Sequence, residues 1–183
     1  IFKLFDDGVG FRYEFPQQKN LTHFIVSEEK TEFHLTGDHK AFWLPGDYDS
    51  NEFSPNITNL SEVNAEDPKF AASIFAHQFF DHNAVQTPLM LKSKDGLYIN
   101  IHEAALVNYP AMDLVIDKSN FNLTSSLVPD ALGNKAYLQT PAKTPWRTII
   151  VSDKATDILA SHTILNLNDP SVIKDPSWIK PTK

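Results

Sequence analysis

Apolar and polar residues alternate in short segments along much of this chain, and the clearest case lies within residues 87–106. From Leu97 to Ile101 every second residue is apolar, which places these side chains on one face of an extended strand. An Asp-Gly step ending at Gly96 comes just before them and supplies the positive φ that a tight turn needs. The pattern therefore predicts a β-hairpin whose first strand ends at residues 89–91.

Glu103 continues the same alternation and falls on the apolar face of this strand. A carboxylate is costly to bury unless a cation or strong hydrogen-bond donors meet it. Two interpretations follow from the residues alone. Glu103 reaches solvent at the rim of the sheet where the strand ends, or it is a ligand for a metal ion or a substrate at the sheet edge.

Other segments of the chain predict a sheet-rich fold with little helix. Strands are expected at 8–15, 31–36, 112–116, 121–124, 136–139, 146–151 and 163–168, with a strand or short helix at 21–26. Residues 153–159 predict a short helical turn capped by Ser152, residues 51–67 a loop, and residues 68–80 a short helix or a strand at 75–80.

Many short strands and 12 prolines favour an all-β antiparallel sandwich over a parallel α/β sheet, which needs long crossover helices. We expect the sandwich to occupy residues 1–168. Prolines punctuate residues 169–183, which indicates a linker.

Composition limits the classes of partner that the chain is expected to bind. Its 183 residues include 16 Lys and Arg against 23 Asp and Glu, and the formal charge of −7 argues against nucleic acid or an anionic membrane surface. Neutral ligands such as sugars stay compatible. There is no cysteine, and no apolar run approaches the ~20 residues that span a bilayer. The chain opens without Met or a basic signal region, so we expect a processed or excised piece.

Aromatic residues offer one further set of candidates. Trp43 and Tyr48 flank a Pro-Gly turn, where they either stack on a sugar ring or pack beneath the turn. Phosphate-binding loops, zinc-protease motifs and serine-hydrolase elbows are absent from the sequence. Carboxylate pairs for glycoside chemistry meet in space and cannot be chosen from spacing.

Five blocks of sequence, in order, resemble glycoside hydrolase family 97. They are DDGVGFRYEFP at 6–16, AFWLPGDY at 41–48, the stretch from PL to DGLYINIHEAAL at 88–106, QTP and TPWRTI within 139–149, and LNLN at 165–168. The resemblance reaches over nearly the whole chain, with a poor match at residues 51–84.

This resemblance implies a fold and a role. The family comprises bacterial α-glucosidases and α-galactosidases, often periplasmic, with an N-terminal β super-sandwich of the galactose-mutarotase type, a (β/α)₈ barrel and a C-terminal β-sandwich. The chain would be the later, larger part of the N-terminal domain, without the first strands, and residues 169–183 would lead towards the barrel. The catalytic carboxylates of the family lie on the barrel, so no catalytic residue is expected here and the isolated chain should be inactive.

The resemblance also gives Glu103 a role, because the IHEAA block of the family carries a glutamate that joins barrel glutamates around Ca²⁺. Oxygen ligands suit that ion. Within this chain the site would be incomplete and empty. The implied partners are the barrel itself and an oligosaccharide with α-linked glucose or galactose, in a periplasmic or secreted enzyme.

Two other functions stay open at this point. One is a free-standing carbohydrate-binding or scaffold module that uses Trp43, Tyr48 or Trp146 to stack on sugars. The other is a mutarotase-like epimerase, which rests on analogy of fold alone.

Overall fold

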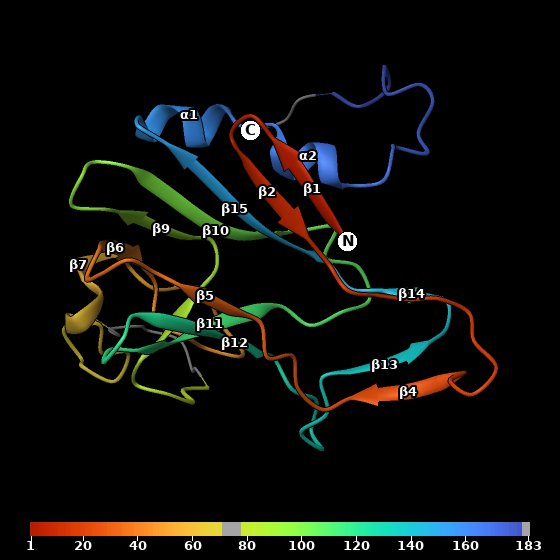
Figure 1. Ribbon diagram of the computed structural model, residues 1–183, viewed down its shortest axis with the longest axis horizontal. Helices are drawn as coiled ribbons and strands as arrows, with labels where there is room; N and C mark the ends of the chain where they lie inside the picture. The colour runs from red at the N-terminus through yellow and green to blue at the C-terminus, as the bar shows by residue number, and fades with distance from the viewer. Residues whose placement is uncertain (71–77, 181–183) are drawn as a thin grey trace.

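Two antiparallel β-sheets packed face to face form the body of the protein in the computed structural model, which describes residues 1–70 and 78–180 (Figure 1). Within those residues the larger sheet has seven strands in the order β1-β2-β15-β10-β9-β6-β7 and the smaller has four in the order β5-β12-β11-β8. The expectation of an all-β antiparallel sandwich is confirmed.

The strands of the larger sheet, in chain order, are β1 (Phe2–Phe5), β2 (Gly8–Phe11), β6 (Lys40–Trp43), β7 (Asn56–Asn59), β9 (Leu89–Lys92), β10 (Tyr98–Ala104) and β15 (Trp146–Ser152). Those of the smaller sheet are β5 (Glu32–His34), β8 (Ala84–Gln86), β11 (Met112–Asp117) and β12 (Asn122–Leu127). Two short ribbons pair β3 (Glu14–Phe15) with β14 (Ala142–Lys143) and β4 (His23–Val26) with β13 (Ala136–Gln139). The β4–β13 ribbon projects away from the two sheets (Figure 1).

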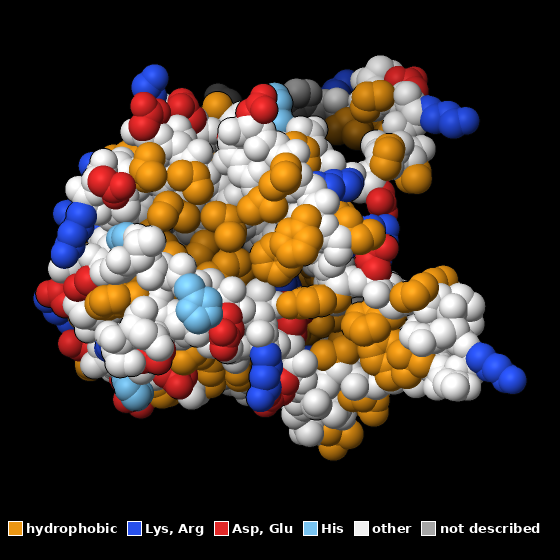
Figure 2. Space-filling view, viewed as in Figure 1, with side chains coloured by type: hydrophobic (Ala, Val, Ile, Leu, Met, Phe, Trp, Pro, Cys, Tyr) orange, Lys and Arg blue, Asp and Glu red, His pale blue; other side chains and the backbone are white. Residues whose placement is uncertain are grey.

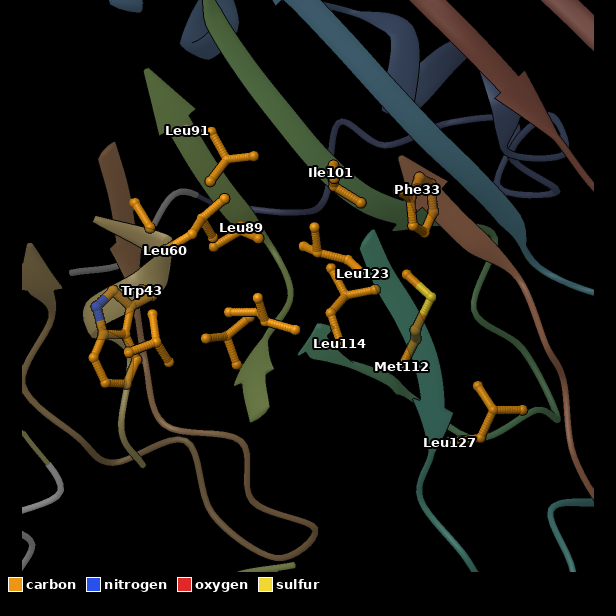
Figure 3. Close-up of a cluster of buried hydrophobic side chains, with 14 residues drawn as sticks. Phe33, Trp43, Leu60, Leu89, Leu91, Ile101, Met112, Leu114, Leu123 and Leu127 are labelled. Carbon is orange, nitrogen blue, oxygen red and sulfur yellow. The ribbon is translucent and has the colours of Figure 1, made fainter. Parts of the chain in front are cut away.

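The main hydrophobic core lies between the two sheets (Figure 3). Leu89 and Ile101 from the larger sheet face Leu114 and Leu123 from the smaller one, and all four side chains are buried. Their positions follow the alternation of each strand, because every second side chain points into the space between the sheets.

The central hairpin forms as the sequence predicts. β9 and β10 pair in register, and Gly96 adopts a φ of 98° in the turn between them. The amide of Gly96 donates a hydrogen bond of 3.1 Å to the carbonyl oxygen of Ser93. β10 lies between β9 and β15, so the strand that carries Glu103 is interior to the sheet.

Two short helices, α1 (Ala155–Ala160) and α2 (Thr163–Leu167), cover the side of the larger sheet that faces away from the smaller one (Figure 1). The strand expected at 163–168 is therefore wrong. Ile164 and Leu167 are three residues apart, and in a helix this spacing puts both against Trp146 and Ala104. A short apolar run fits strand and helix equally well, and contact with the sheet decides between them.

Helix α1 confirms the expected turn at 153–159, although it begins at Ala155 and its N-cap residue is Lys154. The Ser152 hydroxyl accepts a hydrogen bond from the Lys154 amide and donates one to Asp157.

Two other expectations differ from the structure, and a third is not tested by it. The strand expected at 8–15 is broken into β2 and β3, with Arg12 and Tyr13 between them. The loop expected at 51–67 contains β7 and a 3₁₀ turn, η1 (Leu60–Glu62), whose Leu60 is fully buried. The helix or strand expected within 68–80 falls largely on residues 71–77, outside the described residues.

The end of the described chain, residues 169–180, contains no helix or strand. The assignment of residues 169–183 as a linker towards a barrel stays a prediction. No helix among the described residues has the length and apolar character needed to cross a membrane.

Candidate functional site

Glu103 lies near the end of β10 with only 6% of its surface exposed, so it does not reach bulk solvent. It extends the row of inward-facing side chains begun by Ile101, as the alternation predicts. One carboxylate oxygen, Oε2, accepts hydrogen bonds from the Met112 amide at 3.1 Å and from the Thr87 hydroxyl at 3.4 Å. The interpretation of Glu103 as a solvated residue at the rim is therefore wrong.

The buried carboxylate is met by a buried cation, Arg147. The two residues are directly opposed in the register of β10 and β15, and Arg147 is 0% exposed. Nη1 of Arg147 donates a hydrogen bond to Oε1 of Glu103. A charge that would be costly alone is offset here by a neighbour of opposite sign.

Arg147 has a second carboxylate partner, Glu29, from the loop between β4 and β5. Nε and Nη2 of Arg147 donate to the two oxygens of Glu29, each at 2.8 Å, which is a bidentate ion pair. Glu29 also accepts hydrogen bonds from the Thr31 hydroxyl at 2.8 Å and the Tyr109 hydroxyl at 2.9 Å. We call Glu29, Arg147 and Glu103 the buried triad.

The two carboxylates of the triad are not equivalent. Burial raises the pKa of Glu29, but the hydrogen bonds and charge of Arg147 outweigh it, and the net pKa lies below the usual range. Burial likewise raises the pKa of Glu103, and there the single contact with Arg147 does not overcome it. The hydrogen bonds agree with this difference, because Arg147 donates two to Glu29 and one to Glu103.

A further buried acid, Asp113, lies on β11 directly after Met112. Burial is the main cause that raises its pKa to about 8, and the negative charges of Asp47 and Glu103 contribute to that rise. The raised pKa of Asp113 thus reflects its burial and the excess of negative charge in this part of the sandwich.

The family resemblance implies a calcium ion. Of the buried triad, only Glu103 could serve as a ligand of that ion. Among the described residues no group of three or more His, Cys, Asp or Glu side chains could hold a metal ion. A carboxylate offers about four lone-pair positions, and three hydrogen bonds reach Glu103. Its Oε1 atom keeps one position for a cation, but calcium needs 6–8 oxygens.

The sequence showed Glu103 but not its partners. Arg147, like Glu103, is a charged residue at an inward-facing position of a strand that is otherwise rich in β-branched residues. Two such charges of opposite sign on neighbouring strands indicate an ion pair. Glu29 and Tyr109 lie in loops, where alternation gives no information about direction.

The aromatic candidates for sugar stacking are mostly buried. Trp43 is 2% exposed, donates from Nε1 to the Thr58 hydroxyl and packs on the ring of Phe70. Trp146 is 1% exposed, beneath α2 and the side chain of Arg12. Neither offers an indole face to a sugar.

Tyr48, the third candidate, is half-buried. Its ring stacks on Phe80 with centroids 3.9 Å apart, and its hydroxyl bonds to that of Ser126 at 2.9 Å.

Comparison with known proteins places the chain in a family. Residues 1–170 match the family model described as Glycosyl-hydrolase 97 N-terminal. The chain therefore belongs to this family of N-terminal domains, as the five sequence blocks indicate.

Among curated proteins, a retaining alpha-galactosidase of Bacteroides thetaiotaomicron is 26% identical over 212 residues, covering 100% of this chain and 29% of that protein. Among solved structures, a Glycoside Hydrolase Family 97 enzyme from Pseudoalteromonas sp. strain K8, in complex with acarbose, is 37% identical with a TM-score of 0.81. That match covers 98% of this chain and 25% of the enzyme. A beta-arabinopyranosidase at 20% identity and a TM-score of 0.62 shares the fold. The chain thus spans less than a third of the length of these relatives.

Proposed function

We propose that this chain is the non-catalytic N-terminal part of a calcium-dependent α-glycosidase. It shapes the rim of an active site whose catalytic carboxylates lie on a (β/α)₈ barrel outside these residues, and it supplies Glu103 as one ligand of the calcium ion. The retaining alpha-galactosidase and the family 97 enzyme, which this chain resembles in sequence at 26% and 37% identity, support this role.

The observation that carries the calcium proposal is the incomplete neutralisation of Glu103. Its carboxylate is buried at the end of β10, its Oε1 atom keeps a lone-pair position, and Arg147 is bound mainly by Glu29. A divalent ion would balance the negative charge of Glu103 that the single guanidinium of Arg147 does not neutralise. When bound, calcium supplies positive charge to the active site.

The proposed substrate is an oligosaccharide that ends in α-linked glucose or galactose. The relatives from Pseudoalteromonas were solved in complex with acarbose and with panose, and the Bacteroides relative is an alpha-galactosidase. Hydrolysis would proceed through a pair of carboxylates and an oxocarbenium-like transition state on the barrel. A periplasmic or secreted location, in a bacterium that degrades polysaccharides, fits this role.

An exposed apolar face supports the further proposal that more strands of the domain precede Ile1. Hydrophobic side chains gather in the hollow between β15 and β5 (Figure 2). Phe2 and Leu4 on β1 are largely exposed, and β5 ends its sheet without a partner on one side among the described residues. Extended segments added next to β5 would cover this face.

Activity measurements test the proposed function. The chain of residues 1–183 is expected to leave p-nitrophenyl α-glucoside and α-galactoside intact, whereas the full-length enzyme that contains it hydrolyses one of them and loses activity in a chelator. In that enzyme, Glu103→Gln is expected to weaken the response to added calcium. Turnover by the chain alone contradicts the non-catalytic role, and an unchanged calcium response contradicts the role of Glu103.

A further inference from the structure

We propose that Glu29 is a positioning residue for the cation site: it occupies two donors of Arg147 and so leaves the charge of Glu103 available to a metal ion. The inference rests on the proposed role of Glu103 as a calcium ligand. It assigns a function to a loop residue that does not itself approach the ion.

The geometry of the guanidinium carries the argument. Arg147 presents its Nε and Nη2 side to Glu29, where both oxygens are engaged at 2.8 Å, and only Nη1 is directed at Glu103. A bidentate pair is stronger and more directional than a single contact. Arg147 is therefore fixed by Glu29, and its contact with Glu103 follows from that placement.

Glu29 is itself held in place independently of Glu103. The hydroxyl of Thr31 donates to Oε1 and the hydroxyl of Tyr109 donates to Oε2, so each oxygen of Glu29 has a partner besides Arg147. The Tyr13 hydroxyl lies 3.1 Å from that of Thr31 and extends the network. Glu29 thus carries its full charge in a fixed orientation next to Arg147.

The net charge of the buried triad determines how strongly it attracts a cation. With two carboxylates and one guanidinium, the buried triad carries a net charge of −1 when all three groups are ionised. If Glu29 were neutral, Arg147 would be balanced by Glu103 alone, and the triad would offer no net charge to an incoming cation. Removing the charge of Glu29 should therefore weaken calcium binding although Glu103 is unchanged.

The test compares Glu29→Gln with Glu28→Gln in the full-length enzyme. Glu28 is the adjacent residue of the same loop, with a side chain 63% exposed and a contact to Lys30 at 3.4 Å, so its replacement changes net charge equally. The readout is the calcium concentration at the midpoint of the calcium-induced rise in melting temperature, relative to each variant without calcium. A purely structural role of Glu29 lowers the melting temperature but does not move this midpoint.

We expect Glu29→Gln to raise the calcium midpoint about tenfold and Glu28→Gln to leave it within twofold, the tenfold change corresponding to about 1.4 kcal/mol. Equal midpoints for the two variants overturn the inference while the role of Glu103 stands. No calcium response in the wild type overturns both. If Glu29→Gln does not fold, Glu29→Asp replaces it: the triad keeps its net charge, but the shorter side chain draws the carboxylate away from Nε and Nη2 of Arg147. An unchanged midpoint in Glu29→Asp contradicts the positioning role of Glu29.

Discussion

Glu103 on β10 and Arg147 on β15 face each other across neighbouring strands, and both side chains are buried between the sheets. This pairing explains how a carboxylate is tolerated at a position where the sequence pattern calls for an apolar residue. Because Arg147 is shared with Glu29, the ionised triad carries a net negative charge, which is the property that the proposed calcium site at Glu103 requires.

Arg147→Met should lower the free energy of unfolding of the chain by about 3–5 kcal/mol, because two buried carboxylates then lose their cation. Urea denaturation followed by tryptophan fluorescence at neutral pH measures the change. Combining Arg147→Met with Glu29→Gln and Glu103→Gln should recover much of the loss, since no unpaired charge remains.

Arg12→Met is the matched control, because Arg12 is the other arginine of the chain and its partner Glu14 keeps 35% of its side chain exposed, against 5% for the partners of Arg147; the Met side chain retains apolar cover over Trp146. It is expected to cost about 1 kcal/mol or less. Equal losses for Arg12→Met and Arg147→Met would show that the triad does not depend on charge compensation.

Asp113 should make the stability of the fold depend on pH between about 4 and 8. Its pKa rises from 3.8 to about 8 on folding, so the folded state binds a proton more tightly than the unfolded chain. The stabilisation from this group is complete below pH 4 and is lost as the pH rises towards 8, with a slope of at most about 1.4 kcal/mol per pH unit. Chemical denaturation at a series of pH values gives the profile.

Asp113→Asn removes the titrating group and keeps an oxygen that can accept a hydrogen bond, so the profile should flatten between pH 5 and 8. Asp117 is the control on the same strand: it is exposed and hydrogen bonds to Ser119 lower its pKa, which confines its effect to more acidic solution. An identical slope in wild type and Asp113→Asn would refute the assignment.

A side chain at position 46 is expected to clash with Ala84. A Cβ atom there would lie 2.3 Å from Cβ of Ala84 and 2.9 Å from its carbonyl carbon, and the Gly46 amide already donates to the Ala84 carbonyl at 2.8 Å. Gly46→Ala should therefore destabilise the chain by about 1–3 kcal/mol, as overpacking does. Scanning calorimetry measures the shift against Gly37→Ala, where a Cβ meets nothing within 4 Å and a change within about 0.5 kcal/mol is expected.

Features set by neighbouring residues were predictable from the sequence. The β9–β10 hairpin depends on an Asp-Gly turn and on local alternation, and both are visible in a window of a few residues. The same alternation placed Glu103 on the inner face. Helix α2 was mistaken for a strand because five residues contain too few periods to separate the two structures, and its contact with Trp146 decides the outcome.

The rest of the site depends on contacts between distant segments. Arg147 lies 44 residues from Glu103 and 118 from Glu29, so the triad exists only once the strand order is known. Local patterns do not contain that order, and the direction of a loop side chain such as Glu29 is fixed by its partners alone.

Isothermal titration calorimetry measures directly whether Glu103 is a ligand of the proposed calcium ion. We expect one calcium ion per molecule of full-length enzyme, an affinity at least tenfold weaker in Glu103→Gln, and no binding by residues 1–183 alone. Equal affinity in the wild type and in Glu103→Gln would contradict this expectation, because Glu103 would then lie outside the calcium site.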